Sequence, residues 1–311
     1  MKPVLILGGT GHYGRHIVSS LSRRDEAVRV LTRNPDNAKK LFDDQVEIMA
    51  GDITDTDSTK KALTGVRALI ISVSAFSPKL IRRLREIEYD SVLRVLQEAQ
   101  QAGVERVIYI SVYDIRKEAL AKVNKQFASL ALDKQAIEDY LAHSTFNWTV
   151  LGAPPSMDMF FAFIRGNKMM VPGGGPPAIP SVATADVGEI VAQAALRDDL
   201  NGQRFRLTGP EALSFPDAAR RIGQATNREI KFRKIPVLPI KIASILAWPF
   251  TPYLRYLAGS ITLLNLFPPD LAAAVPDDHA QLLQTFDYSP NTLEQAAVNR
   301  DSTETTNNQR G

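Results

Sequence analysis

Short apolar runs alternate with amphipathic stretches over the first 152 residues. The apolar runs predict six strands, at Val4–Leu7, Ala27–Thr32, Val46–Ala50, Val66–Val73, Val104–Ser111 and Asn147–Leu151. Helical periodicity between them predicts helices over 12–24, 78–102 and 130–143. Strands this apolar are typical of strands covered on both faces, and their alternation with helices predicts right-handed βαβ crossovers. We therefore expect an α/β fold with a doubly wound parallel Rossmann sheet.

The sequence after residue 152 predicts a smaller, mostly helical C-terminal domain that binds the substrate. Prolines and glycines cluster where this part begins. We place the domain that contains the predicted sheet at 1–152 and an interleaved second region at 153–298, with 186–200 packing back on the first domain. The polar tail 299–311 is predicted to be disordered.

Composition and charge exclude several classes of function. The 311 residues include no cysteine, which excludes disulfides, thiolate metal sites and cysteine nucleophiles. Four scattered histidines and a net charge of +3 favour neither a metal site nor a nucleic-acid partner. No uncharged apolar stretch reaches the roughly 17–25 residues of a spanning helix, and the N-terminus does not follow the pattern of a signal peptide. We therefore expect a soluble, cytoplasmic protein.

A glycine-rich loop follows the first predicted strand and opens a helix. The loop consists of Gly8, Gly9, Thr10, Gly11, His12, Tyr13 and Gly14. Its glycines allow a tight turn and let a pyrophosphate approach the backbone, and the helix N-terminus offers unpaired N–H groups. Because no Lys-Ser/Thr pair follows the glycines, the loop differs from a nucleoside-triphosphate P-loop. Its place in a βαβ unit predicts a dinucleotide-binding site.

The residue at the end of the second strand indicates which dinucleotide binds. In NAD-binding folds an acid about 20 residues after the glycines holds the ribose 2′-hydroxyl. Here Arg33 stands 19 residues after Gly14, and a guanidinium binds a 2′-phosphate through charge-assisted hydrogen bonds. We expect NADP(H) in preference to NAD(H), with Asp36 as the rival ribose partner. Asp52 and Ile53 follow the third strand, where Asp52 either meets the adenine amine or forms a turn before the next helix.

Eight segments spaced along the chain match one known family. They are Gly8–Arg15, Leu31–Pro35, Gly51–Asp52, Val107–Ser111, Asp133–Glu138, Trp148–Pro154, Ala185–Gly188 and Leu207–Glu211. Together they resemble the NmrA-like branch of the atypical short-chain dehydrogenase/reductases, well over 1–235 and loosely beyond. The resemblance implies NADP(H) bound along the carboxyl ends of the strands, and a small C-terminal domain over the nicotinamide.

The resemblance also implies roles for single residues. By position, Val73 and Ser74 would touch the cofactor ribose, and Ala153 and Pro154 would border the nicotinamide. Lys134 matches the lysine that reaches the nicotinamide ribose in reductases of this kind.

The chain departs from the common short-chain catalytic pattern of Ser with Tyr-x-x-x-Lys. Hydride transfer to a carbonyl leaves an anion that must be protonated or stabilised. Leu130 stands four residues before Lys134, where the tyrosine is expected, and the one literal Tyr-x-x-x-Lys begins at Tyr113, directly after the fifth strand. Three interpretations stay open. Lys134 itself supplies the proton or the electrostatic field that stabilises the anion, or Tyr113 reaches the substrate from the loop after Ser111. In the third, the site is not catalytic.

Charged residues begin the predicted helix 78–102. The basic ones are Lys79, Arg82, Arg83 and Arg85. Glu86 and Glu88 offer local ion pairs, so we expect a solvated helix face rather than a docking patch.

Apolar residues concentrate in two later segments. Residues 157–164 either wall a pocket for a small hydrophobic substrate or form ordinary core. The run 242–269, broken by Pro249 and Pro252, suits a pocket lid, a homodimer face or a peripheral membrane contact.

The sequence supports one leading function and two rivals. We expect an NADPH-dependent oxidoreductase that passes a hydride to a hydrophobic carbonyl, quinone or conjugated substrate. The missing Tyr-x-x-x-Lys also fits a non-catalytic redox sensor that binds NADP(H) and acts through a regulatory protein partner. A nucleotide-sugar epimerase or dehydratase is the further alternative, weakened by the same departure.

Overall fold

The computed structural model describes residues 2–114, 120–123 and 125–308. The chain divides into two compact units. The first unit contains residues 1–114, 128–152 and 187–206, and the second contains 115–127, 153–186 and 207–311. The segment 187–206 returns to the first unit after the chain has entered the second.

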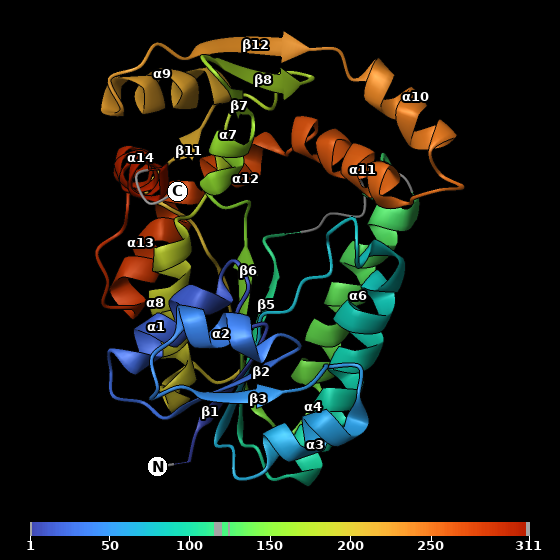
Figure 1. The fold of residues 1–311 in the computed structure, drawn as a ribbon, viewed down its shortest axis with the longest axis vertical. Helices are drawn as coiled ribbons and strands as arrows, with labels where there is room; N and C mark the ends of the chain where they lie inside the picture. Colours follow the sequence, from blue (N-terminus) through green and yellow to red (C-terminus); the bar gives the residue numbers. More distant parts are fainter. Residues whose placement is uncertain (1, 115–119, 124, 309–311) are drawn as a thin grey trace. The chain divides into compact units, whose positions relative to one another are not determined.

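The first unit is built on a seven-stranded sheet, five of whose strands are labelled in Figure 1. Its strand order is β10-β6-β5-β4-β1-β2-β3. Its strands are β1 (Val4–Leu7), β2 (Val28–Thr32), β3 (Glu47–Ala50), β4 (Ala68–Ile71), β5 (Arg106–Val112), β6 (Asn147–Ala153) and β10 (Gln203–Arg206). Val4 of β1 pairs in parallel with Val28 on one side and with Ala68 on the other. The expected doubly wound parallel sheet is confirmed. Its strand order reverses beside β1, and ligands of such sheets bind at this switch point, outside the carboxyl ends of the strands.

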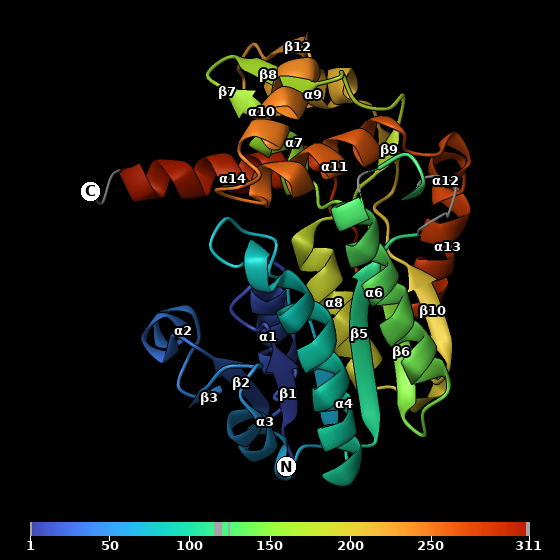
Figure 2. The ribbon, with the colours of Figure 1, turned by 90° about the vertical axis from the view of Figure 1, so that its right-hand side faces the viewer.

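Helices cover both faces of this sheet. They are α1 (Gly14–Ser22), α2 (Pro35–Leu41), α3 (Thr56–Leu63), α4 (Ser91–Gln101), α6 (Lys125–Ala142) and α8 (Thr184–Ala195), with a short 3₁₀ helix at Asp198–Leu200. α1 and α8 lie on one side of the sheet, and α4 and α6 on the other (Figures 1 and 2). Gly188 brings α8 against α1, because a Cβ there would stand 2.7 Å from the backbone of His16.

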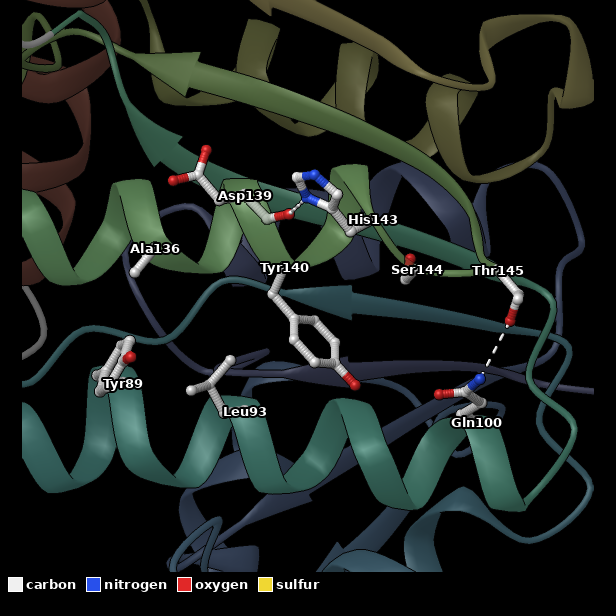
Figure 3. Close-up of a pocket in the computed structure, with 9 residues that line it drawn as sticks. All are labelled: Tyr89, Leu93, Gln100, Ala136, Asp139, Tyr140, His143, Ser144 and Thr145. Atoms are coloured by element: carbon white, nitrogen blue, oxygen red, sulfur yellow. Dashed lines mark hydrogen bonds between the residues drawn. The ribbon is translucent and has the colours of Figure 1, made fainter.

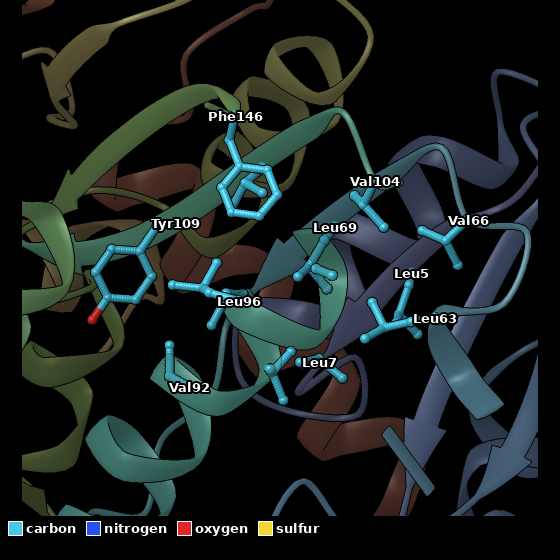
Figure 4. Close-up of a cluster of buried hydrophobic side chains, with 14 of the residues drawn as sticks. Leu5, Leu7, Leu63, Val66, Leu69, Val92, Leu96, Val104, Tyr109 and Phe146 are labelled. Carbon is cyan, nitrogen blue, oxygen red and sulfur yellow. The ribbon is translucent and has the colours of Figure 1, made fainter. Parts of the chain in front are cut away.

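The core between the sheet and α3, α4 and α6 follows the alternation of the strands. Leu5, Leu69 and Val107 point to this side and are fully buried against Leu96 of α4 and Ile137 of α6. Figure 4 shows this cluster, with Tyr109 of β5 at one end of it. Burial of each such aliphatic side chain contributes about 1.5–3 kcal/mol, so this layer fixes the positions of the strand ends.

The predicted helix 78–102 is wrong in one respect, because the structure interrupts it. A 3₁₀ turn at Ile81–Arg83 and a π-helical turn at Glu86–Asp90 precede α4, which begins only at Ser91. The extra residue of a π turn changes which positions face the core, and such turns are frequent at functional sites. Glu88, expected on a solvated face, is only 3% exposed.

The second unit has two small sheets and a helical majority. Its strands are β7 (Ile164–Arg165), β8 (Lys168–Pro172), β9 (Ile179–Pro180), β11 (Ala212–Leu213) and β12 (Lys231–Ile235). Its helices are α7 (Asp158–Ala162), α9 (Phe215–Ala225), α10 (Leu238–Leu246), α11 (Tyr253–Asn265), α12 (Pro269–Ala273), α13 (Val275–Thr285) and α14 (Leu293–Asn308). Phe160, Met169 and Phe215 are fully buried in its core, so the apolar segment 157–164 contributes to core packing.

The C-terminal helix α14 extends to Asn308, where the composition predicted a disordered tail. Leu293 and Ala297 anchor this helix in the core of the second unit. Arg300 adds a contact 3.7 Å from Asp158 on α7. Residues 309–311 lie outside the described residues. None of the described helices is long and apolar enough to cross a membrane.

Candidate functional site

The glycine loop between β1 and α1 is packed so closely that side chains are excluded from it. Gly8 has a φ of 85°, and a Cβ there would lie 2.3 Å from the carbonyl oxygen of Ser72. A Cβ on Gly14 would lie 2.0 Å from the carbonyl oxygen of Gly8. The Gly11 N–H donates to that same carbonyl at 2.9 Å and closes the turn. No side chain caps α1, so its N-terminus is left as a cradle for an anion.

A cleft of about 510 Å³ opens at this loop, at the carboxyl ends of β1, β2, β3 and β4. Its lining includes ten of the residues predicted to bind the cofactor: Gly8, Thr10, Gly11, His12, Tyr13, Arg33, Asp52, Ile53, Val73 and Ser74. Gly14 supports the loop from within α1 and is buried. The structure therefore brings together residues that the sequence places in four separate segments.

The end of β2 supplies the residue that was predicted to bind the 2′-phosphate. Arg33 is exposed and lines the cleft. Asn34 is occupied as the N-cap of α2, where its side chain accepts from the Asn37 N–H at 3.0 Å. Asp36, the rival ribose partner, lies in the first turn of α2 and is absent from the lining of the cleft.

Asp52 forms the turn that was one of its two predicted roles, while its contact with an adenine stays a prediction. It lines the cleft, and its Oδ1 accepts from the N–H and the hydroxyl of Thr54, both at 2.9 Å. This is an Asx turn that leads into α3, whose N-cap is Asp55. One carboxylate oxygen of Asp52 is thus used structurally.

A buried ion pair joins Lys134 of α6 to Glu88 of the π turn. Lys134 Nζ lies 3.0 Å from Glu88 Oε2, and the two side chains are 12% and 4% exposed. Lys134 Nζ also lies 5.7 Å from the centre of the Tyr109 ring. Sequence analysis placed Glu88 on a solvated surface and missed this pairing.

The other oxygen of Glu88 holds the loop that borders the cleft. Glu88 Oε1 accepts from the backbone N–H of Ala75 at 2.6 Å and from the hydroxyl of Ser74 at 3.4 Å. Ser74 lines the cleft. One carboxylate therefore links Lys134 to the segment predicted to touch the cofactor ribose.

Lys134 remains a cation at neutral pH. Burial alone would lower its pKa, but the neighbouring oxygens of Tyr109 and Glu88 outweigh burial and hold the pKa above its ordinary value. Burial raises the pKa of Tyr109, so its phenol is neutral near pH 7 and Glu88 supplies the opposing charge.

Two hydroxyls on β5 are buried beside this pair. The oxygens of Tyr109 and Ser111 have no hydrogen-bond partner among the described residues. The two positions differ by two, so both side chains lie on the same face of the strand, near its carboxyl end. Buried hydroxyls are normally hydrogen-bonded, and orphaned ones mark a place for a missing partner such as a ligand or an ordered water.

Tyr113 lies just beyond β5 and is 4% exposed. Its ring centre lies 6.0 Å from the guanidinium carbon of Arg206. Arg204 fixes the backbone here, because its guanidinium donates to the carbonyl of Val112 at 2.9 Å and pairs with Glu138 of α6 at 2.7 Å. Lys117, the other end of the literal Tyr-x-x-x-Lys, lies outside the described residues.

The remaining predicted contacts concern the nicotinamide. Ala153 is the last residue of β6, and Pro154 follows it. Both are assigned to the second unit, and their contact with the cofactor stays a prediction.

Glu88 was detectable from the sequence by its spacing. It stands four residues after Leu84 and four before Val92, both of which are apolar and buried. A charged residue on the apolar stripe of a helix has to be paired, because an isolated buried charge is costly.

A second hollow, of about 440 Å³, lies between α4 and α6 (Figure 3). Tyr140 of α6 points toward α4, and Gln100 bridges to Thr145 at 3.2 Å. Its nine lining residues include no glycine, and it has no helix N-terminus. It offers no cradle for a phosphate, in contrast to the cleft at the glycine loop. Among the described residues, no group of three or more acidic or histidine side chains could hold a metal ion.

Residues 8–198 match the model of a protein family described as NAD(P)H-binding. The match spans more than half of the chain, from the glycine loop through Lys134 to the end of α8. The chain belongs to the NAD(P)H-binding family. The family relationship predicted from the spaced motifs is therefore confirmed.

Known proteins similar to this NAD(P)H-binding chain differ in what they do. A photosystem II assembly factor of Trieres chinensis is 22% identical over 247 residues, which are 78% of this chain and 74% of that protein. The NAD(P)H azoreductase of Xenophilus azovorans is 23% identical and covers 88% of this chain and 90% of its own. An NADPH-dependent quinone oxidoreductase of Escherichia coli shares the fold with a TM-score of 0.71, at 19% identity over 95% of this chain and 98% of that one.

The cleft of this NAD(P)H-binding chain fits a dinucleotide on two structural observations. Cβ atoms at Gly8 and Gly14 would overlap the carbonyl oxygens of Ser72 and Gly8, so only glycine allows the tight turn that places the loop backbone at the cleft. The hydroxyl of Ser111, which has no hydrogen-bond partner among the described residues, lies near the carboxyl end of β5, the strand whose Tyr109 contacts Lys134. The glycine loop would hold the pyrophosphate. The nicotinamide half would lie at the carboxyl end of β5, on the side that Lys134 of α6 covers.

Proposed function

We propose that this chain is an NADPH-dependent reductase that passes a hydride to a hydrophobic carbonyl, quinone or conjugated acceptor. The observation that carries the proposal is the buried Lys134 ammonium, which Glu88 fixes near the carboxyl end of β5. A preorganised cation in a site of low polarity stabilises negative charge that develops on an acceptor oxygen. The buried hydroxyl of Ser111 on the same strand has no hydrogen-bond partner among the described residues, which leaves a place for a ligand or an ordered water.

The preference for NADP(H) over NAD(H) rests on Arg33. Its side chain is exposed at the cleft, and Asp36 is absent from the lining, so a 2′-phosphate meets a guanidinium there. In this proposal the loop Gly8–Gly14 binds the pyrophosphate, Asp52 and Ile53 lie beside the adenine, and Val73 and Ser74 lie along the ribose. NADPH, when bound, supplies the hydride.

Lys134 acts in this proposal as a fixed charge. Its raised pKa keeps the ammonium protonated at neutral pH, so it orients the ribose and holds the developing oxyanion. The proton that neutralises the product comes from a hydroxyl, and Ser111 and Tyr113 at the end of β5 are its candidates. The similarity to an azoreductase and to a quinone oxidoreductase supports acceptors of this chemical kind.

A redox sensor is the second candidate function. Leu130 occupies the position where short-chain enzymes carry the catalytic tyrosine, and the chain is similar to an assembly factor. In this alternative the same cleft binds NADP(H), and a regulatory protein partner reads its redox state.

The test is a panel of quinones, azo compounds and carbonyls, assayed with NADPH and NADH. We expect NADPH oxidation with at least one acceptor, and a loss of roughly 100-fold in kcat for Lys134→Met, as for removal of one oxyanion donor. Lys125→Met is the matched control, because Lys125 is exposed on the same helix. A protein that binds NADPH but never oxidises it would support the sensor, and one that binds neither dinucleotide would contradict both.

A further inference from the structure

Helix α10 carries an apolar stripe on its exposed side. Leu238, Ile242, Ile245 and Leu246 are 65%, 48%, 63% and 70% exposed. At about 100° per residue, these four positions fall within roughly 100° of one another around the helix. The buried residue of α10, Ser244, lies on the opposite side. The helix thus presents outward the face that a surface helix ordinarily buries.

The stripe continues beyond the helix and is concentrated in one short segment. Trp248 is 38% exposed and Phe250 is 80% exposed. Six of the twelve exposed large hydrophobic side chains of the described residues lie between Leu238 and Phe250. The apolar run predicted at 242–269 is therefore divided, because the later helix α11 buries Ala258 and Ile261 and packs Leu264 against the core.

The charges around the stripe have one sign. Between residues 230 and 269 the chain contains five basic residues and no acidic one. Lys241 stands on α10 at the border of the apolar stripe. The guanidinium carbon of Arg255 lies 4.8 Å from the centre of the Trp248 ring, at the end of the stripe. Exposed aliphatic residues bordered by tryptophan and basic side chains are typical of helices that lie in a membrane interface.

We propose that α10, with Trp248 and Phe250, docks on the surface of a lipid bilayer that contains anionic headgroups. The helix lies in the plane of the interface, because no described helix is long and apolar enough to cross a membrane. Its aliphatic stripe enters the acyl boundary, while Lys241 and Arg255 reach the phosphates. A lipid surface fits better than a protein partner, since the four exposed residues of the stripe on α10 are all aliphatic and the basic residues beside them complement anionic lipid. This inference stands independently of the proposed reductase activity.

The test is flotation of the full chain with vesicles of phosphatidylcholine alone or mixed with phosphatidylglycerol. We expect binding to the mixed vesicles, which weakens as salt rises from about 0.1 M to about 1 M and the Debye length falls from about 10 Å to about 3 Å. Ile245→Glu should lower partitioning at least about tenfold, since one buried apolar side chain is lost from the interface. Leu283→Glu is the matched control, because Leu283 is 45% exposed on α13 of the same unit.

A second variant and a second measurement keep the test decisive. Lys241→Glu should weaken binding to the mixed vesicles while leaving the circular dichroism spectrum unchanged. In a Trp148→Phe background, the emission of Trp248 should shift to the blue when vesicles are added. Vesicle binding that survives both Ile245→Glu and Lys241→Glu would overturn the proposal. The proposal would also be overturned if the chain did not bind vesicles and formed a dimer that dissociated when Ile245 was changed. The stripe would then be an interface between two copies of the chain.

Discussion

Replacing Glu88 by glutamine tests the buried pair that organises the site. The substitution keeps the size of the side chain and an oxygen that can accept from the Ala75 N–H, but it removes the charge that faces Lys134. Removing one partner of a buried ion pair typically costs 3–5 kcal/mol, because the other charge stays buried. Since the glutamine still accepts hydrogen bonds, we expect the free energy of unfolding of the first unit to fall by about 3 kcal/mol.

The assay is equilibrium unfolding in urea, monitored by tryptophan fluorescence in a Trp248→Phe background. The remaining Trp148 packs against the core of the first unit and reports on that unit. Lys134→Met and the double variant Glu88→Gln/Lys134→Met complete a double-mutant cycle. Because the double variant leaves no buried charge, its loss of stability should be clearly smaller than the sum of the two single losses.

The pH dependence of the unfolding free energy provides an independent check on the direction in which Glu88 shifts the pKa of Lys134. In the native protein the pKa of Lys134 is raised, so the stability it contributes is present at neutral pH and is lost only as the pH rises through that pKa. Without Glu88, burial prevails and lowers the pKa of Lys134. The variant should therefore gain stability relative to the native protein as the pH rises toward 10. Two results would refute the reasoning. One is a double variant whose loss of unfolding free energy equals the sum of the two single losses. The other is a difference in stability between the native protein and Glu88→Gln that widens as the pH rises.

Three further variants address the loop, the cofactor preference and the second unit. Gly14→Ala should lower the free energy of unfolding in urea by about 1–3 kcal/mol, since its Cβ would overlap the carbonyl of Gly8. Arg33→Ser should weaken NADPH binding in calorimetry roughly tenfold or more while leaving NADH binding unchanged; an equal effect on both would exclude a 2′-phosphate contact. Arg221 lowers the pKa of Glu294 to about 2 through hydrogen bonds, so stability present above the ordinary pKa is lost as the pH falls through about 2. Glu294→Gln should remove this loss of stability at low pH, which amounts to about 0–1 kcal/mol for a pair this exposed. A pH profile of the unfolding free energy that is the same in the variant would contradict the prediction.

The sheet and the cofactor cleft could be predicted because their determinants are local in sequence. Apolar runs placed the strands to within a few residues, and the glycine spacing fixed the loop that Gly8 and Gly14 close. Arg33 and Asp52 follow strand ends, and parallel strands bring their carboxyl ends to one edge of the sheet.

The buried pair and the exposed helix could not be predicted in the same way. The spacing of Glu88 between Leu84 and Val92 places it on the apolar side of the helix, but its partner lies 46 residues away on α6, and the sequence does not indicate which residue that is. The orientation of α10 depends on which of its sides the rest of the second unit covers. Hydrophobicity identified the segment, but only the tertiary structure separates its exposed stripe from the buried residues of α11.

Calorimetric titration of the full chain with NADPH and NADH, on the native protein and on Gly14→Ala, tests the central claim most directly. We predict one NADPH per chain, NADPH bound more tightly than NADH, and loss of binding of both dinucleotides in Gly14→Ala, because the added Cβ would overlap the carbonyl of Gly8 and displace the loop that would hold the pyrophosphate. Dinucleotide binding that is absent from the native protein, or unchanged in Gly14→Ala, would contradict it.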